Sequence, residues 1–196
     1  MFCHDGKRGK TMKYKGEAAL RDGTVISLRS LRENDAQQTL ALLRKTAGET
    51  RNLIRHEHEW TMTSEQEGEV IRHAQYGPKS LMIGAFADGK LVGMGSIMPP
   101  AGVDRARHRA NLGVLVLKSH WGMGVGSALV HALIGQAKTT ALEQLELEVV
   151  STNERAIRLY ERFGFAEFAR HPRKLKYRDG SYADMVLMML ELRRNQ

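Results

Sequence analysis

The sequence predicts a single-domain α/β protein, a mixed sheet with helices on its faces. Its 196 residues suffice for one domain with a sizeable core. Segments whose apolar residues alternate with a period of two are interleaved with segments whose apolar residues recur every three to four positions, as strands and helices do. A hydrophobic content of 42% and a charged content of 27% are typical of globular domains, which argues against wholesale disorder and fibrous classes.

The first predicted elements follow a basic N-terminal segment. Residues 1–16 are rich in Lys and Gly and poor in apolar residues, so we expect a flexible basic arm there and the folded domain over residues 17–196. A short apolar segment at residues 25–31 predicts the first strand. The next stripe has helical spacing and predicts a helix that Gly48 ends; its members are Ala36, Leu40, Leu43 and Ala47.

A polar segment at residues 49–62 separates this helix from the next. It contains His56 and His58, but two histidines two positions apart have no third ligand at a suitable spacing, so no metal is predicted. Ser64-x-x-Glu67 matches a capping box and predicts the start of a second helix, which ends near Gly77.

Two apolar runs then predict an antiparallel hairpin. Residues 81–87 and 91–98 are joined by Asp88-Gly89, a strong signal for a two-residue turn. The basic loop at 104–109 that follows is either solvated or in contact with an acidic substrate or a nucleotide phosphate.

The most informative stretch is a strand, a glycine-rich turn and a helix between residues 111 and 130. Residues 112–117 are apolar, three glycines follow at alternate positions from Gly122 to Gly126, and apolar residues then resume at helical spacing. A helix start offers unpaired N–H groups and a positive dipole end, and glycines allow close approach. The stretch therefore predicts a site for a phosphate ester.

The last third of the chain predicts three more strands and one helix. Residues 145–150 alternate as a strand, with Glu146 and Glu148 on one face. Ser151-x-x-Glu154 is interpreted as the cap of a helix that ends at Gly164. Strands are predicted at 165–169 and 182–190, separated by a basic stretch and an Asp179-Gly180 turn.

Two motifs together resemble the GNAT N-acetyltransferase superfamily. The glycine spacing fits neither the dinucleotide fingerprint nor a P-loop. It is similar to the superfamily's pyrophosphate loop, Q/R-x-x-G-x-G/A, with Trp121 in place of Gln or Arg. Residues 153–165 resemble its N-x-x-A-x-x-L-Y-x-x-x-G-F signature at every position. The resemblance spans about residues 25–190 and implies the GNAT fold: a mixed, mostly antiparallel sheet with splayed parallel central strands, flanked by helices.

The resemblance implies acetyl-CoA as co-substrate and no metal. Backbone groups of the central strand would pair with the pantetheine arm, and amides of the glycine-rich turn would hold the pyrophosphate. Asn153 is expected to contact the cofactor, with a helix cap as the alternative. The expected cofactor-binding residues besides Asn153 are Leu115, Val116, Leu117, Gly122, Met123, Gly124, Val125, Gly126 and Ser127.

Catalytic roles also follow from the resemblance, here to the ribosomal-protein-alanine N-acetyltransferase branch. Its spacing makes Glu148 the general base and Tyr160 the general acid. The alternatives are a solvated strand residue for Glu148 and a core residue for Tyr160. Asn111 stands where many relatives carry a Glu, and Asn cannot accept a proton. The base is therefore Glu148, a water, or an acid from residues 49–59.

The predicted function is acetyl transfer to a primary amine by direct attack, with a small molecule such as an amino acid, a polyamine or an antibiotic-like amine as the expected acceptor. Residues 55–60, the loop at 104–109, and Tyr182 with Asp184 are expected to shape specificity. One alternative is a protein N-terminal or lysine acetyltransferase. Another is a catalytically silent module that binds acyl-CoA or nucleic acid.

Charge and composition bear on partners and location. The net charge of +8 suits a polyanionic cofactor as well as nucleic acid, and the 6% aromatic content argues against nucleic-acid stacking. A single Cys3 and the lack of a long apolar stretch predict a cytoplasmic protein without a membrane partner. Superfamily members often pair, so the resemblance leaves a homodimer as an expectation.

Overall fold

One sheet runs through the whole fold. The computed structural model describes residues 12–192, and its eight strands are ordered β1-β2-β3-β4-β5-β6-β8-β7. Every neighbouring pair is antiparallel except β5 and β6, which are parallel. The strands are β1 Lys15–Ala19, β2 Val25–Ser30, β3 Leu81–Ala87, β4 Lys90–Met98, β5 Arg109–Val116, β6 Gln144–Val150, β7 Ala166–Lys176 and β8 Tyr182–Glu191.

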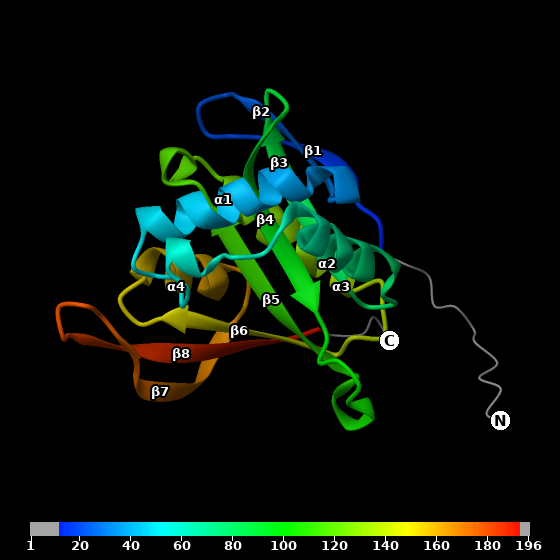
Figure 1. Cartoon of the computed structure of the whole chain (residues 1–196). Helices are drawn as coiled ribbons and strands as arrows, with labels where there is room; N and C mark the ends of the chain where they lie inside the picture. The colour runs from blue at the N-terminus through cyan, green and yellow to red at the C-terminus, as the bar shows by residue number, and fades with distance from the viewer. Residues whose placement is uncertain (1–11, 193–196) are drawn as a thin grey trace.

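Helices cover both faces of this sheet (Figure 1). α1 and α2 enclose one hydrophobic cluster with β3 and β4, and α3 and α4 contribute to a larger cluster on the opposite face. This confirms the predicted mixed α/β architecture. The helices are α1 Ala36–Glu49, α2 Ser64–Tyr76, α3 Val125–Ala137 and α4 Glu154–Arg162, with short 3-10 turns η1 Glu33–Asp35, η2 Glu57–Glu59, η3 Asp104–Ala106 and η4 Lys118–His120.

The parallel strands β5 and β6 separate soon after they meet. Their pairing covers only residues 109–111 of β5 and 144–146 of β6. β5 continues to Val116, paired with β4, and β6 continues to Val150, paired with β8. The two strands therefore splay within the sheet and leave a gap between their carboxyl ends, as the resemblance implied.

The N-terminal part of the fold begins earlier than the sequence predicted. Residues 1–11 of the predicted basic arm lie outside the described residues. Within its last part, Met12 is 4% exposed in the larger cluster, and Lys15 and Gly16 belong to β1. The ordered domain therefore includes residues assigned to the arm, because β1 pairs with β2 despite its polar sequence.

Two predicted helix caps were wrong. α2 is capped by Thr63, whose hydroxyl accepts the Gln66 N–H, so Ser64 and Glu67 form no capping box. α4 is capped by Asn153, whose side chain accepts the Ala156 N–H at 3.3 Å, and not by Ser151. In each case a neighbouring residue can make the same bond, and tertiary packing decides where the helix begins.

The hairpin prediction is confirmed, and one strand is longer than expected. Asp88 and Gly89 both have positive φ angles, 47° and 74°, as the two-residue turn between β3 and β4 requires. β7 runs from Ala166 through the basic stretch to Lys176, with a register shift between His171 and Leu175. In residues 12–192, no helix has the length and apolar character needed to cross a membrane.

Glu67 is buried instead of capping α2. The residue is 3% exposed, and burial raises the pKa of its carboxyl from 4.5 to about 7. A buried carboxyl favours its neutral form. Between these two pH values the folded protein binds more protons than the unfolded chain, so this residue makes stability fall as pH rises from about 4.5 to about 7.

We therefore expect Glu67→Gln to stabilise the protein above pH 7, by about 3 kcal/mol, and to change little below pH 4.5. Denaturant unfolding at pH 5 and pH 8 measures the difference. Glu69→Gln on the exposed side of α2, where the carboxylate is paired with Arg72, is the control for the same substitution in the same helix. If Glu67→Gln raised the free energy of unfolding equally at both pH values, the raised pKa assigned to Glu67 would be contradicted.

Candidate active site

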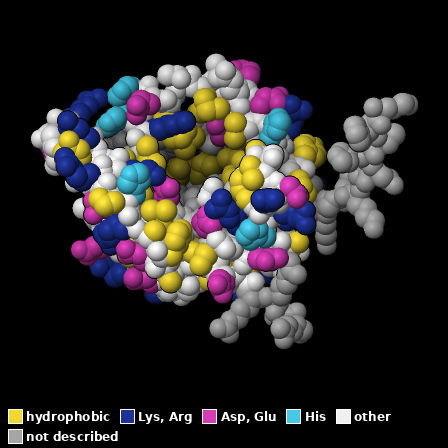
Figure 2. Space-filling model, turned by 90° about the horizontal axis from the view of Figure 1, so that it is seen from below, with side chains coloured by type: hydrophobic (Ala, Val, Ile, Leu, Met, Phe, Trp, Pro, Cys, Tyr) yellow, Lys and Arg dark blue, Asp and Glu magenta, His cyan; other side chains and the backbone are white. Residues whose placement is uncertain are grey.

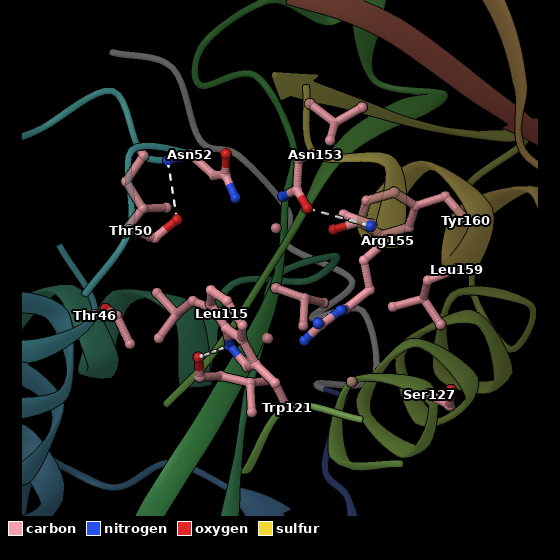
Figure 3. A pocket seen from close by; sticks show the side chains of 18 of the residues that line it. Thr46, Thr50, Asn52, Leu115, Trp121, Ser127, Asn153, Arg155, Leu159 and Tyr160 are labelled. Atoms are coloured by element: carbon pink, nitrogen blue, oxygen red, sulfur yellow. Dashed lines mark hydrogen bonds between the residues drawn. The ribbon is translucent and has the colours of Figure 1, made fainter. Parts of the chain in front are cut away.

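The gap between β5 and β6 opens into a cleft of about 870 Å³. One wall is α4 with the turn before it, and the opposite wall is the end of α1 with the segment after it (Figure 3). Seen from below, the molecule has a hollow with hydrophobic side chains on its floor and Lys and Arg side chains at its rim (Figure 2). The cleft lining has the same composition: apolar strand residues together with several arginines.

The direction of the β5 backbone decides which groups face the gap. The Leu117 N–H donates to a β4 carbonyl at 3.0 Å, whereas the His108 carbonyl accepts two N–H bonds at the start of β6, at 2.7 and 3.3 Å. Because alternate residues of a strand direct their backbone groups to opposite neighbours, Val114 and Val116 face the side where β6 has diverged. The backbone of Leu115 and Leu117 is directed to β4.

The glycine-rich turn presents a row of amides at the start of α3. Gly122 and Gly124 have φ angles of 80° and 111°, a left-handed conformation that a side chain would strain. The first intrahelical bond of α3 joins the Ala128 N–H to the Gly124 carbonyl at 3.0 Å, so the amides of residues 125–127 have no acceptor within the helix. A Cβ at Gly126 would lie 3.3 Å from Leu159 of α4. This turn can bind an anion in the way that helix starts do.

Trp121 and Arg155 link the glycine-rich turn to the two neighbouring elements, β5 and α4. The Trp121 indole N–H donates to the Val116 carbonyl at 2.8 Å, which closes the end of β5. The Arg155 side chain extends from α4 toward Trp121, and its guanidinium carbon lies 5.0 Å from the indole ring centroid (Figure 3). No carboxylate among residues 12–192 pairs with Arg155, so its charge is available to a ligand beside the amide row.

Tyr160 lies in the cleft wall formed by α4. Its side chain is 7% exposed and packs edge-on against Phe165, with ring centroids 5.8 Å apart. Burial raises the pKa of its phenol to about 12, so the hydroxyl is protonated at neutral pH. That hydroxyl makes no hydrogen bond with any other residue of the described range, although Tyr160 lines the cleft. A protonated phenol without a protein partner can donate its proton to a ligand.

Glu148 also lines the cleft, and its carboxylate has an ion-pair partner. Its carboxylate accepts two hydrogen bonds from the Lys174 ammonium of β7, at 2.9 and 3.1 Å. Its side chain is 43% exposed, so water reaches the pair. Asn111 is directly opposite Glu146, whose carboxylate is occupied by Arg109 at 2.6 Å. Glu146 is therefore committed to an ion pair with a neighbouring strand.

The cleft unites most of the predicted site residues and leaves out three. Leu115, Val116, Gly122, Gly124, Gly126, Ser127, Glu148, Asn153 and Tyr160 line it. Leu117 and Met123 are not in the lining, and Val125 is fully buried. Asn153 also serves as the α4 cap, so the two interpretations offered for it are compatible.

Sequence reasoning missed several lining residues. Val114 could have been found from the alternation along the strand, because the backbone N–H and C=O groups that face the gap belong to the even-numbered residues of β5. Arg155 could have been found as a basic residue two positions after Asn153, at the start of the predicted helix. Arg21, Thr50 and Asn52 come from segments far away in sequence, and no local pattern marks them.

The expectation of no metal site stays a prediction. His56 and His58 stack on each other with ring centroids 5.6 Å apart. Within residues 12–192, no group of three or more His, Cys, Asp or Glu side chains is arranged to hold a metal ion.

Comparisons with known proteins agree with this architecture. A sequence model described as the acetyltransferase (GNAT) family matches residues 47–165. The mycothiol acetyltransferase of Propionibacterium freudenreichii is 27% identical over 142 residues, which cover 72% of this chain and 43% of that protein. This chain thus spans less than half of the length of that curated relative.

Two solved structures are similar over most of the chain. A GNAT-family acetyltransferase from Streptococcus pneumoniae has a TM-score of 0.82 and 26% identity, covering 85% of this chain and 99% of that one. The putative acetyltransferase yncA from Salmonella typhimurium, solved with its cofactor acetyl-CoA, has a TM-score of 0.77 and 21% identity, covering 87% and 96%. At that identity the second likeness concerns the fold alone.

The amide row beside Arg155 should bind a diphosphate. We expect adenosine diphosphate to bind the protein in calorimetry, and Arg155→Gln to weaken binding about tenfold, since it removes one charge-assisted contact. Arg158→Gln on the same helix is the control, because the Arg158 guanidinium is already paired with Glu154 at 2.9 Å. Equal losses in both variants would show that general charge, and not the position of Arg155, governs binding.

Proposed function

Because the chain belongs to the acetyltransferase (GNAT) family, we propose that it is an N-acetyltransferase that transfers an acetyl group from acetyl-CoA to a primary amine. The observation that carries this proposal is one cleft that combines three features. Within residues 12–192 they are a strand edge with no strand opposite, a row of helix-start amides, and a buried tyrosine hydroxyl without a hydrogen-bond partner.

The cleft suits the two ends of acetyl-CoA. Uncompensated backbone groups are costly to bury, so a ligand with its own amides is a good partner for the strand edge at Val114 and for the Val116 N–H, the Val116 carbonyl being bonded to the Trp121 indole. We assign the pantetheine arm to these residues, in place of the set Leu115, Val116 and Leu117 expected from the sequence. The pyrophosphate is assigned to the amides of residues 122–127 together with Arg155. With its thioester in the cleft, acetyl-CoA supplies an activated acetyl group.

The reaction needs two proton movements, and the cleft has a candidate for each. The amine nitrogen forms a bond to the acetyl carbon, and the carbon–sulfur bond breaks. The Tyr160 hydroxyl is assigned to donate a proton to the departing sulfur, which a phenol that stays protonated at neutral pH can do. The amine must lose a proton, and Glu148, directly or through a water, is assigned to accept it.

The acceptor is proposed to be a small amine, with a protein N-terminus or lysine as the alternative. The cleft is bounded on the acceptor side by Thr50, Asn52 and Leu53, which follow α1. A catalytically silent acyl-CoA-binding module would also fit the amide row, but it would have no need for a tyrosine hydroxyl left without a partner.

The direct test is release of free CoA thiol from acetyl-CoA in the presence of a panel of amines. The panel includes amino acids, polyamines, aminoglycosides and peptides with free N-termini. Turnover that depends on one class of amine is expected. Tight CoA binding with no turnover for any amine would replace the enzyme by the silent binding module.

Tyr160→Phe should lower kcat by about 100-fold or more with little change in the KM for acetyl-CoA, because it removes only the proton donor. The Tyr160 hydroxyl makes no hydrogen bond within the described residues, so the variant should keep the wild-type unfolding temperature. Thiol release and thermal unfolding measure both effects. Full turnover in this variant would remove Tyr160 from the mechanism.

Glu148→Gln should lower kcat about tenfold or more at neutral pH, with partial recovery at higher pH, where the amine loses its proton to solvent. A pH profile of thiol release checks this. Lys174→Met, which removes the ion-pair partner but leaves the carboxylate, is the companion variant and should retain most activity. If Glu148→Gln has an unchanged profile, the base is a water or another acid.

A further inference from the structure

A second cavity of about 320 Å³ adjoins the cleft. It lies between the segment after α1, residues 50–56, and the end of the β7–β8 hairpin, residues 175–179. The two segments are held together by Arg51. Its guanidinium pairs with Asp179 at 2.9 Å and lies over the Tyr177 ring at 3.9 Å from the centroid, and the Tyr177 hydroxyl donates to the Arg51 carbonyl at 3.3 Å.

The cavity lining is strongly cationic. Besides Arg51 it includes Arg55, Lys176 and Arg178, and its carboxylate, Asp179, is already bound to Arg51 and to Ser181. None of Arg55, Lys176 and Arg178 forms an ion pair with a carboxylate in the part of the chain that the structure describes.

Two of these cations rest on aromatic rings instead of on acids. The Arg55 guanidinium lies 4.9 Å from the Trp60 ring centroid, and the Lys176 ammonium lies 5.6 Å from that of Tyr182. A cation held against a ring keeps its N–H donors available. Three positive groups around one cavity repel one another, and an anion between them would relieve this repulsion.

Thr50 and Leu53 line both the cavity and the cleft, so the two spaces are neighbours on either side of these residues. An acceptor with its amine in the cleft, near Glu148 and Tyr160, would have to pass these two residues to place its far end in the cationic cavity.

We propose that the cationic cavity binds an anionic group of the acceptor, so that the preferred substrate is an amine that also carries a carboxylate or a phosphonate. This inference rests on the proposed acetyltransferase function. Arg55, Lys176 and Arg178 select the anion, since guanidinium and ammonium groups form charge-assisted hydrogen bonds with such oxygens. Polyamines and aminoglycosides, which are cationic throughout, are excluded by the same groups.

The test compares matched pairs of acceptors by thiol release from acetyl-CoA. Each ω-amino acid in a series of increasing length is paired with its own carboxamide, aminoalkyl phosphonates form a second arm, and a short acidic peptide with a free N-terminus forms a third. The best acid is expected to exceed its amide by about tenfold or more in kcat/KM, as one or more charge-assisted contacts provide. The third arm distinguishes a free small acid from an acidic peptide as the source of the anion.

Substitutions in the cavity lining test which residues select the anionic acceptor. Arg178→Gln, alone and together with Arg55→Gln, should raise the KM for the acid and leave the KM for its amide unchanged, which reduces the preference to about threefold or less. Lys90→Gln, an exposed cation at the start of β4 that does not line the second cavity, is the matched control and should change neither value. Unfolding temperatures confirm that the variants are folded.

The outcomes separate the two proposals. Equal use of acids and amides, or a preference for polyamines, overturns the anion subsite but leaves the acetyltransferase intact. Equal effects of Arg178→Gln and Lys90→Gln also overturn it. An absence of thiol release with every acceptor, by contrast, contradicts the acetyltransferase function itself.

Discussion

The divergence of two parallel strands is the constraint on which the rest of the structure depends. β5 and β6 pair over only three residues each, and beyond Asn111 no strand of the described residues lies opposite the backbone groups of β5 that are directed to β6. A buried, unpaired backbone edge costs free energy, and native folds rarely keep one. Here the cost is limited because the edge lines a cleft, where water or an extended ligand can take the bonds. The fold thus exchanges local sheet stability for a binding surface.

Other features are arranged around this edge. α3 follows β5 after η4 and the glycine-rich turn, and its free amides line one end of the cleft. The Trp121 indole joins the turn to the last β5 carbonyl. Val125 is fully buried, which fixes the helix start against the core. α4 follows β6 directly, and Asn153 both caps it and faces the cleft. The proposed proton donor, Tyr160, and the proposed pyrophosphate site are therefore positioned by adjacent elements of rigid secondary structure, as a site with precise geometry requires.

The acceptor side has a different character. It is built from the segment after α1 and from the β7–β8 hairpin, which meet through Arg51, Asp179 and Tyr177. These contacts are exposed and individually weak, so this side is the less rigid part of the site. Loops of this kind can vary in sequence while the β5–β6 edge stays the same, and the chemistry of the acceptor can change without a change of fold. The proposed anion subsite in the second cavity would be one such variation.

The sequence by itself determined the elements and half of the site. Periodicity predicted the four helices and most strands, because apolar spacing reflects which face is buried. The glycine spacing and the residues from Asn153 to Phe165 predicted the candidate pyrophosphate turn and Tyr160, both of which line the cleft, because those groups follow one another along the chain. Only the tertiary structure decided which cap is used, that Glu67 is buried, that Val114 and Val116 rather than Leu117 face the gap, and that Lys174 pairs with Glu148. It also brought residues 50–56 against 175–179. These are contacts between distant segments, and local patterns carry no information on which segments meet.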